Sequence, residues 1–383
     1  MDFKGKRILV CDGFAGQIPG VLRQLHELEC VATTLCSSRL DPGFTSRYPV
    51  ERIVVKGYKE NLTIREKAIS QWIYSGQFDV VLPVSDQTTD IVTRGSEKYS
   101  RVVRIAAAPF EAFSKAYDKS QTFLGCEHAN VPCPKTYHQG DDLDSFLDQV
   151  QFPLAVKPRN GHGAIGFRRV DTRDEIITLI DEGLLVPEDN VIQEFIPQDD
   201  VQYLCYLFID HDRQVKTALT VEKQRWFPVN GGALCFGRVT DRPDIIQMSS
   251  KLLWELNWLG FGEVCYINDP RDNTPKVIEI NGRIPASVRI CFLNGFNVVR
   301  QLLELAYGED VTRYITTQKP GMGIRCFQTD FLWLLQSSSK HKLRKWLDCR
   351  NVKDLMFDIR DPLPFFSYSI KNTINYRKEM SHR

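Results

Sequence analysis

Residues 154–170 read LAVKPRNGHGAIGFRRV, an apolar strand that ends near Lys157, a glycine-containing loop, and a strand that returns to Val170. Glycines let a backbone approach a ligand closely, their amides can donate to phosphate oxygens, and a neighbouring lysine supplies a positive charge. The loop is not a Walker loop, because no G-K-[S/T] follows and no helix opens there. By itself the stretch favours an ordinary tight turn over a nucleotide site. The loop glycines are Gly161, Gly163 and Gly166.

A second polar stretch, VIEINGR, occupies residues 277–283. Residues two apart on a strand share a face, so Glu279, Asn281 and Arg283 are predicted to project together. A carboxylate and an amide oxygen are ligands that Mg²⁺ accepts, and a guanidinium binds phosphate oxygens. The alternation fits an exposed polar strand face equally well, although the apolar residues before it count against that interpretation.

A third stretch, VIQEFIP at residues 191–197, is an apolar strand that breaks into an extended segment. Free backbone groups at such a strand end suit the edge of adenine, and a carboxylate a few residues later, at Asp199 or Asp200, can bind ribose hydroxyls. Taken alone, an ordinary strand end with a solvated acidic turn is the simpler interpretation.

Composition limits the class of protein. The chain has 383 residues, 43% of them apolar and 25% charged, which is typical of a globular protein with two or three compact units. Its apolar runs fall far short of the ~20 residues of a bilayer span, and the N-terminus has no signal-like apolar region. Eleven cysteines without a C-x-x-C pair favour reduced thiols, and a net charge of +1 gives no case for nucleic-acid binding. We expect a cytoplasmic protein without an integral membrane segment.

The apolar pattern divides the chain at about residue 108. Short apolar strands alternate with helical stretches up to that point, which predicts a doubly wound parallel α/β sheet. The pattern beyond it is α+β, with a continuous helix predicted over 110–128, two strand pairs, and a hairpin of 263–267 with 276–280. The predicted strands of the first part are 7–11, 30–35, 52–55, 79–83 and 102–107.

The order of these motifs resembles the ATP-grasp superfamily of ligases. The matching positions are Asp118-Lys119, Lys157 with its glycine loop, the QEFI segment at 193–196 and the EINGR segment at 279–283. Residues 7–10, 46–48 and 82–85 are similar to the domain that precedes ATP-grasp in carbamoyl-phosphate-synthetase-like ligases. The resemblance implies a Rossmann-like pre-ATP-grasp domain (1–108), an ATP-grasp domain (109–310) with two α+β lobes (119–190 and 191–310), and a C-terminal extension (311–383).

The resemblance also implies a role for each matching residue. Phosphates of ATP would be held by Lys119 and Lys157 under the loop of Gly161, Gly163 and Gly166. Adenine would meet the backbone of Glu194 and Ile196 beside Gln193, and ribose would meet Asp200. The implied metal ligands are Glu279 and Asn281, for Mg²⁺ or Mn²⁺, and the implied catalytic residues are Lys223, Arg225 and Arg283.

The implied activity is ATP-dependent ligation, in which a carboxylate becomes an acyl phosphate that an amine or another nucleophile captures. Small-molecule carboxylate and amine substrates and a homodimer are the expected partners. One departure motivates an alternative, a nucleotide-binding module with little turnover: Cys265 stands where the family usually has an acidic or amide ligand. Glu263, two residues earlier, is a candidate substitute. Retention of the lysines, Glu279, Asn281 and Arg283 favours the enzyme.

The C-terminal region has its own charge pattern. Residues 340–383 contain 11 basic and 5 acidic residues, and 340–347 read KHKLRKWL. The helical spacing of Leu343, Trp346 and Leu347 predicts that they pack on the core while the lysines stay solvated. The alternative is a peripheral contact with an anionic surface.

Overall fold

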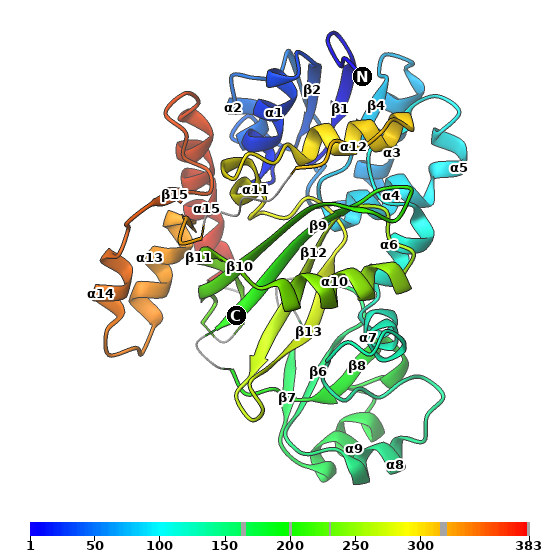
Figure 1. Cartoon of the computed structure of the whole chain (residues 1–383), viewed down its shortest axis with the longest axis vertical. Helices are drawn as coiled ribbons and strands as arrows, with labels where there is room; N and C mark the ends of the chain where they lie inside the picture. The colour runs from blue at the N-terminus through cyan, green and yellow to red at the C-terminus, as the bar shows by residue number, and fades with distance from the viewer. Residues whose placement is uncertain (162–165, 199–200, 230, 315–319, 381–383) are drawn as a thin grey trace.

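The computed structural model describes residues 1–161, 166–198, 201–229, 231–314 and 320–380, and three sheets organise them (Figure 1). The first sheet is parallel throughout, in the order β3-β2-β1-β4-β5, which confirms the predicted α/β class. Both faces are buried, because Ile8 and Val10 enter one core and Leu9 and Cys11 another. Its strands are β1 (Arg7–Val10), β2 (Val31–Cys36), β3 (Glu51–Val54), β4 (Val80–Leu82) and β5 (Arg104–Ile105).

Side-chain caps fix where the helices of this part begin. Asn61 accepts a hydrogen bond from the backbone of Ile64, and Ser85 accepts one from Thr88. The buried Asp12 also accepts from the backbone amide of Ser85 at 2.8 Å. These bonds set the start of α4 at the carboxyl edge of the sheet. The helices are α1 (Ile18–Glu27), α2 (Pro42–Thr45), α3 (Leu62–Tyr74), α4 (Asp86–Arg94) and α5 (Ser96–Tyr99).

The continuous helix predicted over 110–128 is wrong. The structure has two helices there, α6 (Phe110–Tyr117) and α7 (Lys119–His128), with a break at Asp118. Asp118 adopts an extended conformation and its carboxylate accepts from the backbone amide of Ser120 at 2.9 Å, so it caps α7 instead of continuing α6. The break places Lys119 in the first turn of α7.

A small antiparallel sheet, in the order β7-β6-β8, forms the second layer. It consists of β6 (Leu154–Pro158), β7 (Arg168–Val170) and β8 (Asn190–Glu194). Leu154, Val170 and Ile192 pack in one core with Ile176 of α9 and Leu147 of α8. The remaining elements are α8 (Leu143–Gln149), α9 (Arg173–Asp181) and the short 3₁₀ helix η1 (Pro187–Asp189).

The third sheet has the order β13-β12-β9-β10-β11-β14-β15 and is buried on both faces. Alternate residues of β9 separate its two cores: Leu207 packs with α10, whereas Phe208 belongs to the core that includes α12 and α1 (Figure 1). The elements are β9 (Gln202–Ile209), β10 (Val215–Phe227), β11 (Ala233–Thr240), α10 (Pro243–Glu255), β12 (Gly260–Asp269), β13 (Thr274–Asn281), α11 (Arg289–Leu293) and α12 (Val298–Tyr307).

The C-terminal region extends this sheet. Strand β14 (Gly323–Arg325) pairs antiparallel with β11 and parallel with β15 (Val352–Asp354). Helices α13 (Phe327–Gln336) and α14 (Lys342–Leu347) lie between these two strands in sequence, and α15 (Leu363–Met380) returns to α2. No helix among the residues placed by the structure is long and apolar enough to cross a membrane.

The predicted packing of α14 is wrong for two of its three apolar residues. Leu343 is 59% exposed and Leu347 is 61% exposed. Only the ring of Trp346 is partly covered, lying 6.4 Å from the rings of Phe327 and Phe331 on α13. The sequence spacing predicted the helix but not what covers it, because α14 packs against α13, and α13 is the helix that packs against β10 and β11.

A buried ion pair attaches α13 to the large sheet. The guanidinium of Arg225 on β10 donates to both carboxylate oxygens of Asp330, at 2.6 and 3.0 Å, and neither side chain is more than 3% exposed. We expect Asp330→Ala to lower the free energy of unfolding by about 3–5 kcal/mol, because the variant leaves a buried guanidinium unpaired. Urea unfolding measures this, with the exposed Asp212→Ala as control. A loss under about 1 kcal/mol would contradict the structural role.

Candidate active site

A small cavity lies where the three sheets meet. Asp86 lies at the start of α4, beside the first sheet. Tyr117 ends α6, Lys119 begins α7, and Gly161 lies in the loop after β6. The cavity is lined by Asp86, Ala116, Tyr117, Lys119, Gly161, Glu279, Ile280 and Asn281. The structure therefore brings together four residues that the sequence predicted, Lys119, Gly161, Glu279 and Asn281, and adds Asp86.

Three predicted lysines share an unusual environment, because each ammonium group donates to a backbone carbonyl. Lys119 lines the cavity, whereas Lys157 and Lys223 are not among its lining residues. Lys119 reaches Gly161 at 2.8 Å, Lys157 reaches Ile278 at 3.2 Å and Lys223 reaches Gly232 at 2.7 Å. In the described ranges of the chain, none of the three lies within ion-pair distance of a carboxylate. Their positive charges are held in place without being neutralised.

Burial lowers the pKa of all three lysines, and that of Lys157 falls from its ordinary value of 10.5 to about 8. The negative charge of Glu279 opposes this shift in each case, and the charge of Lys119 adds to it at Lys157. A desolvated ammonium gains more from an incoming anion than an exposed one does. The cluster therefore suits a ligand with several negative charges.

Glu279 is the acidic centre of the cluster. Its backbone pairs with Cys265 across β12 and β13, and its charge acts on all three lysines and on Arg283. Among the residues that the structure places, its carboxylate makes no hydrogen bond and no ion pair. Two carboxylate oxygens are thus available to a ligand in a cavity that Lys119 also lines.

The neighbouring polar groups of β12 and β13 are bonded to one another. The Nδ2 of Asn281 donates to Glu263 at 2.7 Å and lies 3.5 Å from the sulfur of Cys265, while its Oδ1 accepts from Arg283 at 3.0 Å. The hydroxyl of Ser287 donates to the other oxygen of Glu263 at 3.0 Å. Burial raises the pKa of Glu263, although Arg283 opposes the shift. Both oxygens of Glu263 are therefore engaged, and it is less available to a ligand than Glu279.

Arg283 links this network to the first sheet through a residue that the sequence analysis missed. Its Nε donates to Asp86 at 3.2 Å. Asp86 follows directly after β4 and the helix cap Ser85, at the carboxyl edge of a parallel sheet. Such edges are where open α/β sheets place ligand-binding side chains, so the position of Asp86 was a usable signal.

The structure does not bring Arg225 to the cavity. Its guanidinium is paired with Asp330 on α13, and it also donates to the backbone carbonyl of Lys345 at 2.8 Å. The pairing of β10 with β11 is irregular between Lys223 and Trp226, so Lys223 and Arg225 do not follow a simple two-residue alternation. Lys223 is close enough to Glu279 for their charges to interact, whereas Arg225 pairs with Asp330 and attaches α13 to the sheet.

The segment predicted to bind adenine has a buried polar atom without a partner. Gln193 on β8 is 2% exposed, and its Oε1 has no hydrogen-bond partner in the part of the chain that the structure describes. Ile196, just beyond the strand, is also buried. Gly161 and Gly166 have the positive φ values of 131° and 76° expected of loop glycines. Gly163 and Asp200 lie outside the described residues.

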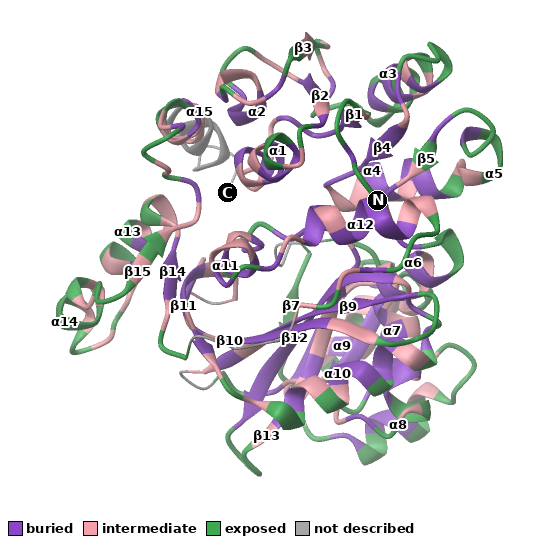
Figure 2. Cartoon of the chain, turned by 45° about the horizontal axis from the view of Figure 1, so that its top comes forward, coloured by how far each residue is buried: buried purple, intermediate pink, exposed green. Residues whose placement is uncertain are grey.

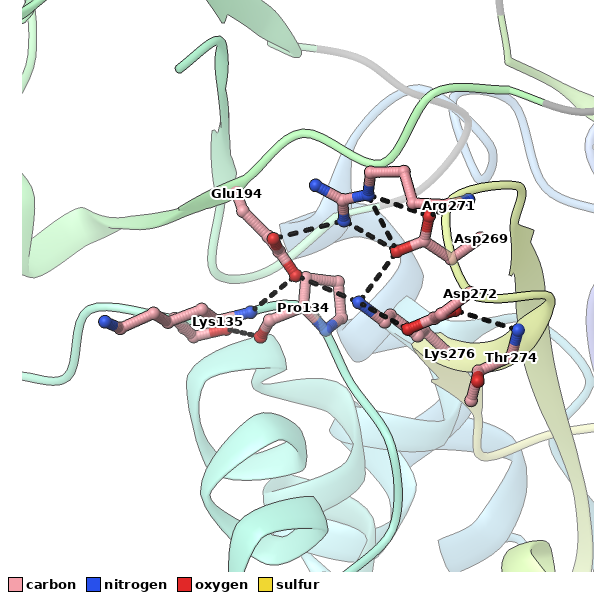
Figure 3. Close-up of polar contacts among 9 residues, drawn as sticks. Pro134, Lys135, Glu194, Asp269, Arg271, Asp272, Thr274 and Lys276 are labelled. Atoms are coloured by element: carbon pink, nitrogen blue, oxygen red, sulfur yellow. Dashed lines mark hydrogen bonds and ion pairs between the residues drawn. The ribbon is translucent and has the colours of Figure 1, made fainter. Parts of the chain in front are cut away.

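The side chain of Glu194 has a role that the sequence did not suggest (Figure 3). It accepts from Lys276 and from Arg271, each at 3.2 Å, and both cations also contact Asp269, at 2.7 and 2.6 Å. Hydrogen bonds from Arg271 and Lys276 hold the pKa of Asp269 well below its usual range, against the effect of burial. The cluster ties the end of β8 to the turn between β12 and β13, across two sheets.

Comparison with known proteins assigns the family. Residues 116–287 match the family model of the ATP-grasp domain. This part of the chain is an ATP-grasp domain. The match includes every residue of the cavity except Asp86, and it confirms the resemblance drawn from the motifs.

Several known proteins are similar to the chain. A D-aspartate ligase from Enterococcus faecium (strain Aus0004) is 25% identical over 246 residues, which cover 59% of this chain and 58% of that ligase. The chain thus spans less than two thirds of that relative's length. The biotin carboxylase domain of the Hydrogenobacter thermophilus 2-oxoglutarate carboxylase, solved as a dimer with MgADP, ADP and bicarbonate, has a TM-score of 0.66 at 16% identity, covering 82% of this chain and 71% of that one.

An L-amino acid ligase from Bacillus licheniformis has a TM-score of 0.61 at 17% identity, covering 79% of this chain and 74% of that one. At these identities the two structures show that the fold is shared. Their coverage also extends the similarity beyond residues 116–287.

The lowered pKa of Lys157 predicts a pH dependence of stability. Lys157 titrates near pH 8 in the folded chain and near ~10.4 when unfolded, so between these values the unfolded chain binds more protons and stability rises with pH. We expect wild type to gain stability relative to Lys157→Met as the pH rises from about 8 to 10. Urea unfolding of both proteins measures the difference, in which other titrations cancel. A pH-independent difference would contradict the lowered pKa.

Proposed function

We propose that the chain is an ATP-dependent ligase that activates a carboxylate as an acyl phosphate and passes the acyl group to an amine. The observation that carries this proposal is the set of Lys119, Lys157 and Lys223, held by carbonyls around the unpaired carboxylate of Glu279. Ligation activity in the D-aspartate ligase relative agrees with it.

The residues around the cavity fit ATP as the phosphoryl donor. Three ammonium groups without carboxylate partners match the charge of a triphosphate. The unpartnered Oε1 of Gln193 can accept a hydrogen bond from the exocyclic amine of adenine, beside the backbone of Glu194 and Ile196. We assign the phosphates to the lysines and the base to the end of β8, and we keep Asp200 as the proposed ribose contact.

The oxygen donors also fit Mg²⁺. No group of three or more potential metal ligands among His, Cys, Asp and Glu occurs in the described residues, so the protein would supply few ligands itself. Mg²⁺ commonly binds in this way, through one or two protein oxygens together with phosphates and water. Glu279 and Asn281 would hold the ion, which when bound neutralises phosphate charge. The same oxygens would accept Mn²⁺.

The proposed reaction has two steps. A carboxylate oxygen of the substrate forms a bond to the γ-phosphorus as the bond to the bridging oxygen breaks and ADP leaves. The amine then attacks the acyl carbon, phosphate leaves and the amine loses a proton. Lys157, Lys223 and Arg283 stabilise the charge on the transferred phosphoryl group, and orientation supplies most of the remaining rate enhancement.

The second candidate is a nucleotide-binding module with little turnover, and the specific observation in its favour is Cys265. Its thiol lies in the cavity network, and burial and then the charge of Glu263 raise its pKa well above the ordinary value, so it remains a neutral thiol. A neutral thiol is a poor Mg²⁺ ligand.

The proposed homodimer is independent of this choice, and light scattering of the purified chain tests it.

Removing charge from the cluster should abolish turnover. We expect Lys157→Met and Glu279→Gln each to lower ADP release by roughly a hundredfold or more, because each removes a charged contact to the transferring phosphoryl group. The assay supplies ATP, Mg²⁺ and pooled carboxylates and amines. Lys216→Met is the control for loss of a lysine charge, because Lys216, on β10, pairs with Asp210 at 2.8 Å instead of belonging to the cluster.

Near-normal ADP release by both cluster variants would end the ligase proposal. Wild type that binds ATP without carboxylate-dependent ADP release would favour the binding module. Thermal stabilisation by a non-hydrolysable ATP analogue separates binding from turnover.

Changing Cys265 should alter the Mg²⁺ requirement. We expect Cys265→Asp to lower the Mg²⁺ concentration for half-maximal activity, by about threefold or more, because it adds a hard oxygen donor opposite Glu279. Cys265→Ser, which adds only a neutral hydroxyl, is the control. An inactive Cys265→Asp together with a normal Cys265→Ser would instead assign the position to packing.

A further inference from the structure

Helices α13 and α14 lie at the edge of the molecule and carry exposed residues (Figure 2). On α13, Phe327, Phe331 and Leu335 repeat every fourth residue and are 44%, 43% and 61% exposed. On α14, Leu343 and Leu347 are exposed to a similar extent. We call these five residues the hairpin surface. Stripes at this spacing normally face a core, and here they face outward.

The two stripes belong to one surface because they meet at Trp346. Its ring contacts Phe327 and Phe331 on α13, and its own helix places it beside Leu343 and Leu347. The guanidinium of Arg325 lies over the rings of Phe327 and Trp346, at 5.2 and 4.9 Å. The rings of Phe327, Phe331 and Trp346 thus connect α13 and α14 beneath the exposed leucines.

The hairpin surface is fixed to the rest of the fold. Arg225 on β10 pairs with Asp330 of α13 and also donates to the backbone carbonyl of Lys345 on α14. Strands β14 and β15, which flank the two helices in sequence, pair with each other. The exposed apolar residues therefore stand on a rigid support and do not come from a frayed end.

The charges beside this surface are mainly positive, and the acidic residue that follows Leu347, Asp348, pairs with Arg350 at 3.0 Å. Residues 331–347 contain no Asp or Glu, and they include Lys340, Lys342, Arg344 and Lys345. Lys340 and Arg344 are exposed, next to the exposed leucines of α14. Apolar side chains bordered by cations, with a tryptophan among them, are typical of segments that lie in the interface of an anionic bilayer.

We propose that the hairpin surface docks the protein peripherally on an anionic lipid bilayer. The leucines and phenylalanines enter the boundary between headgroups and acyl chains, and the exposed basic residues Lys340 and Arg344 contact the lipid phosphates. The positive charge of this segment favours an anionic lipid surface over a second copy of this chain. A symmetric contact between two copies would bring two cationic segments together.

Co-sedimentation with vesicles tests the docking. We expect wild type to bind vesicles of roughly one third phosphatidylglycerol in phosphatidylcholine at ~0.1 M salt, and to dissociate towards ~1 M salt as screening increases. Lys340→Gln with Arg344→Gln should weaken binding about 25-fold, since each basic residue near such a surface contributes about fivefold. Leu343→Ser with Leu347→Ser should weaken it at least about tenfold.

The matched control is Val50→Ser with Leu62→Ser, which removes two exposed apolar side chains, 68% and 50% exposed, from another part of the fold. It should bind vesicles like wild type. Melting temperatures near that of wild type confirm that the variants fold. Equal binding to pure phosphatidylcholine, or vesicle binding unaffected by the leucine variant, would overturn the proposal. A lipid-free dimer that the leucine variant dissociates would assign the surface to a second copy instead.

Discussion

The candidate site depends on hydrogen bonds from three lysine ammonium groups to backbone carbonyls. Taking a charge out of water is costly unless an opposite charge or several hydrogen bonds compensate it. At Lys119, Lys157 and Lys223 a carbonyl supplies part of that compensation and leaves the net charge in place. Glu279 lies among them, and no described residue pairs with its carboxylate. The site is therefore electrostatically incomplete, and a polyanion with a divalent cation would complete it.

The chain assembles this incomplete cluster from distant segments. The break at Asp118 sets Lys119, the end of β6 sets Lys157, β10 sets Lys223 and β13 sets Glu279. Contacts between sheets then hold these elements in place. Glu194 joins β8 to the turn after β12 through Arg271 and Lys276, and Asp86 joins the first sheet to Arg283. A ligase must orient two substrates and a triphosphate, and orientation to this degree requires rigid connections.

Local sequence patterns predicted part of the site, but they did not predict contacts between residues that are far apart in the sequence. The alternation in VIEINGR placed Glu279 and Asn281 on one face, and both line the cavity. The family resemblance implied that Lys223 and Arg225 act together, but Arg225 is paired with Asp330 and the irregular pairing of β10 with β11 separates the two residues. Asp118 was interpreted as part of a continuous helix, although its side chain ends one helix and caps the next. The spacing of Leu343 and Leu347 indicated an amphipathic helix but not its exposure.

The sequence by itself determined the α/β class of the first part and the ordered motifs of an ATP-grasp domain, because these depend on periodicity and residue type within a few positions. Only the tertiary structure decided which charges are paired. Arg225 is neutralised by Asp330, 105 residues away. Glu194 is held by Arg271 of the turn after β12 and by Lys276 of β13, and the three lysines donate to backbone carbonyls. Pairing between distant residues depends on strand register, bulges and the packing of sheets, which no local pattern encodes.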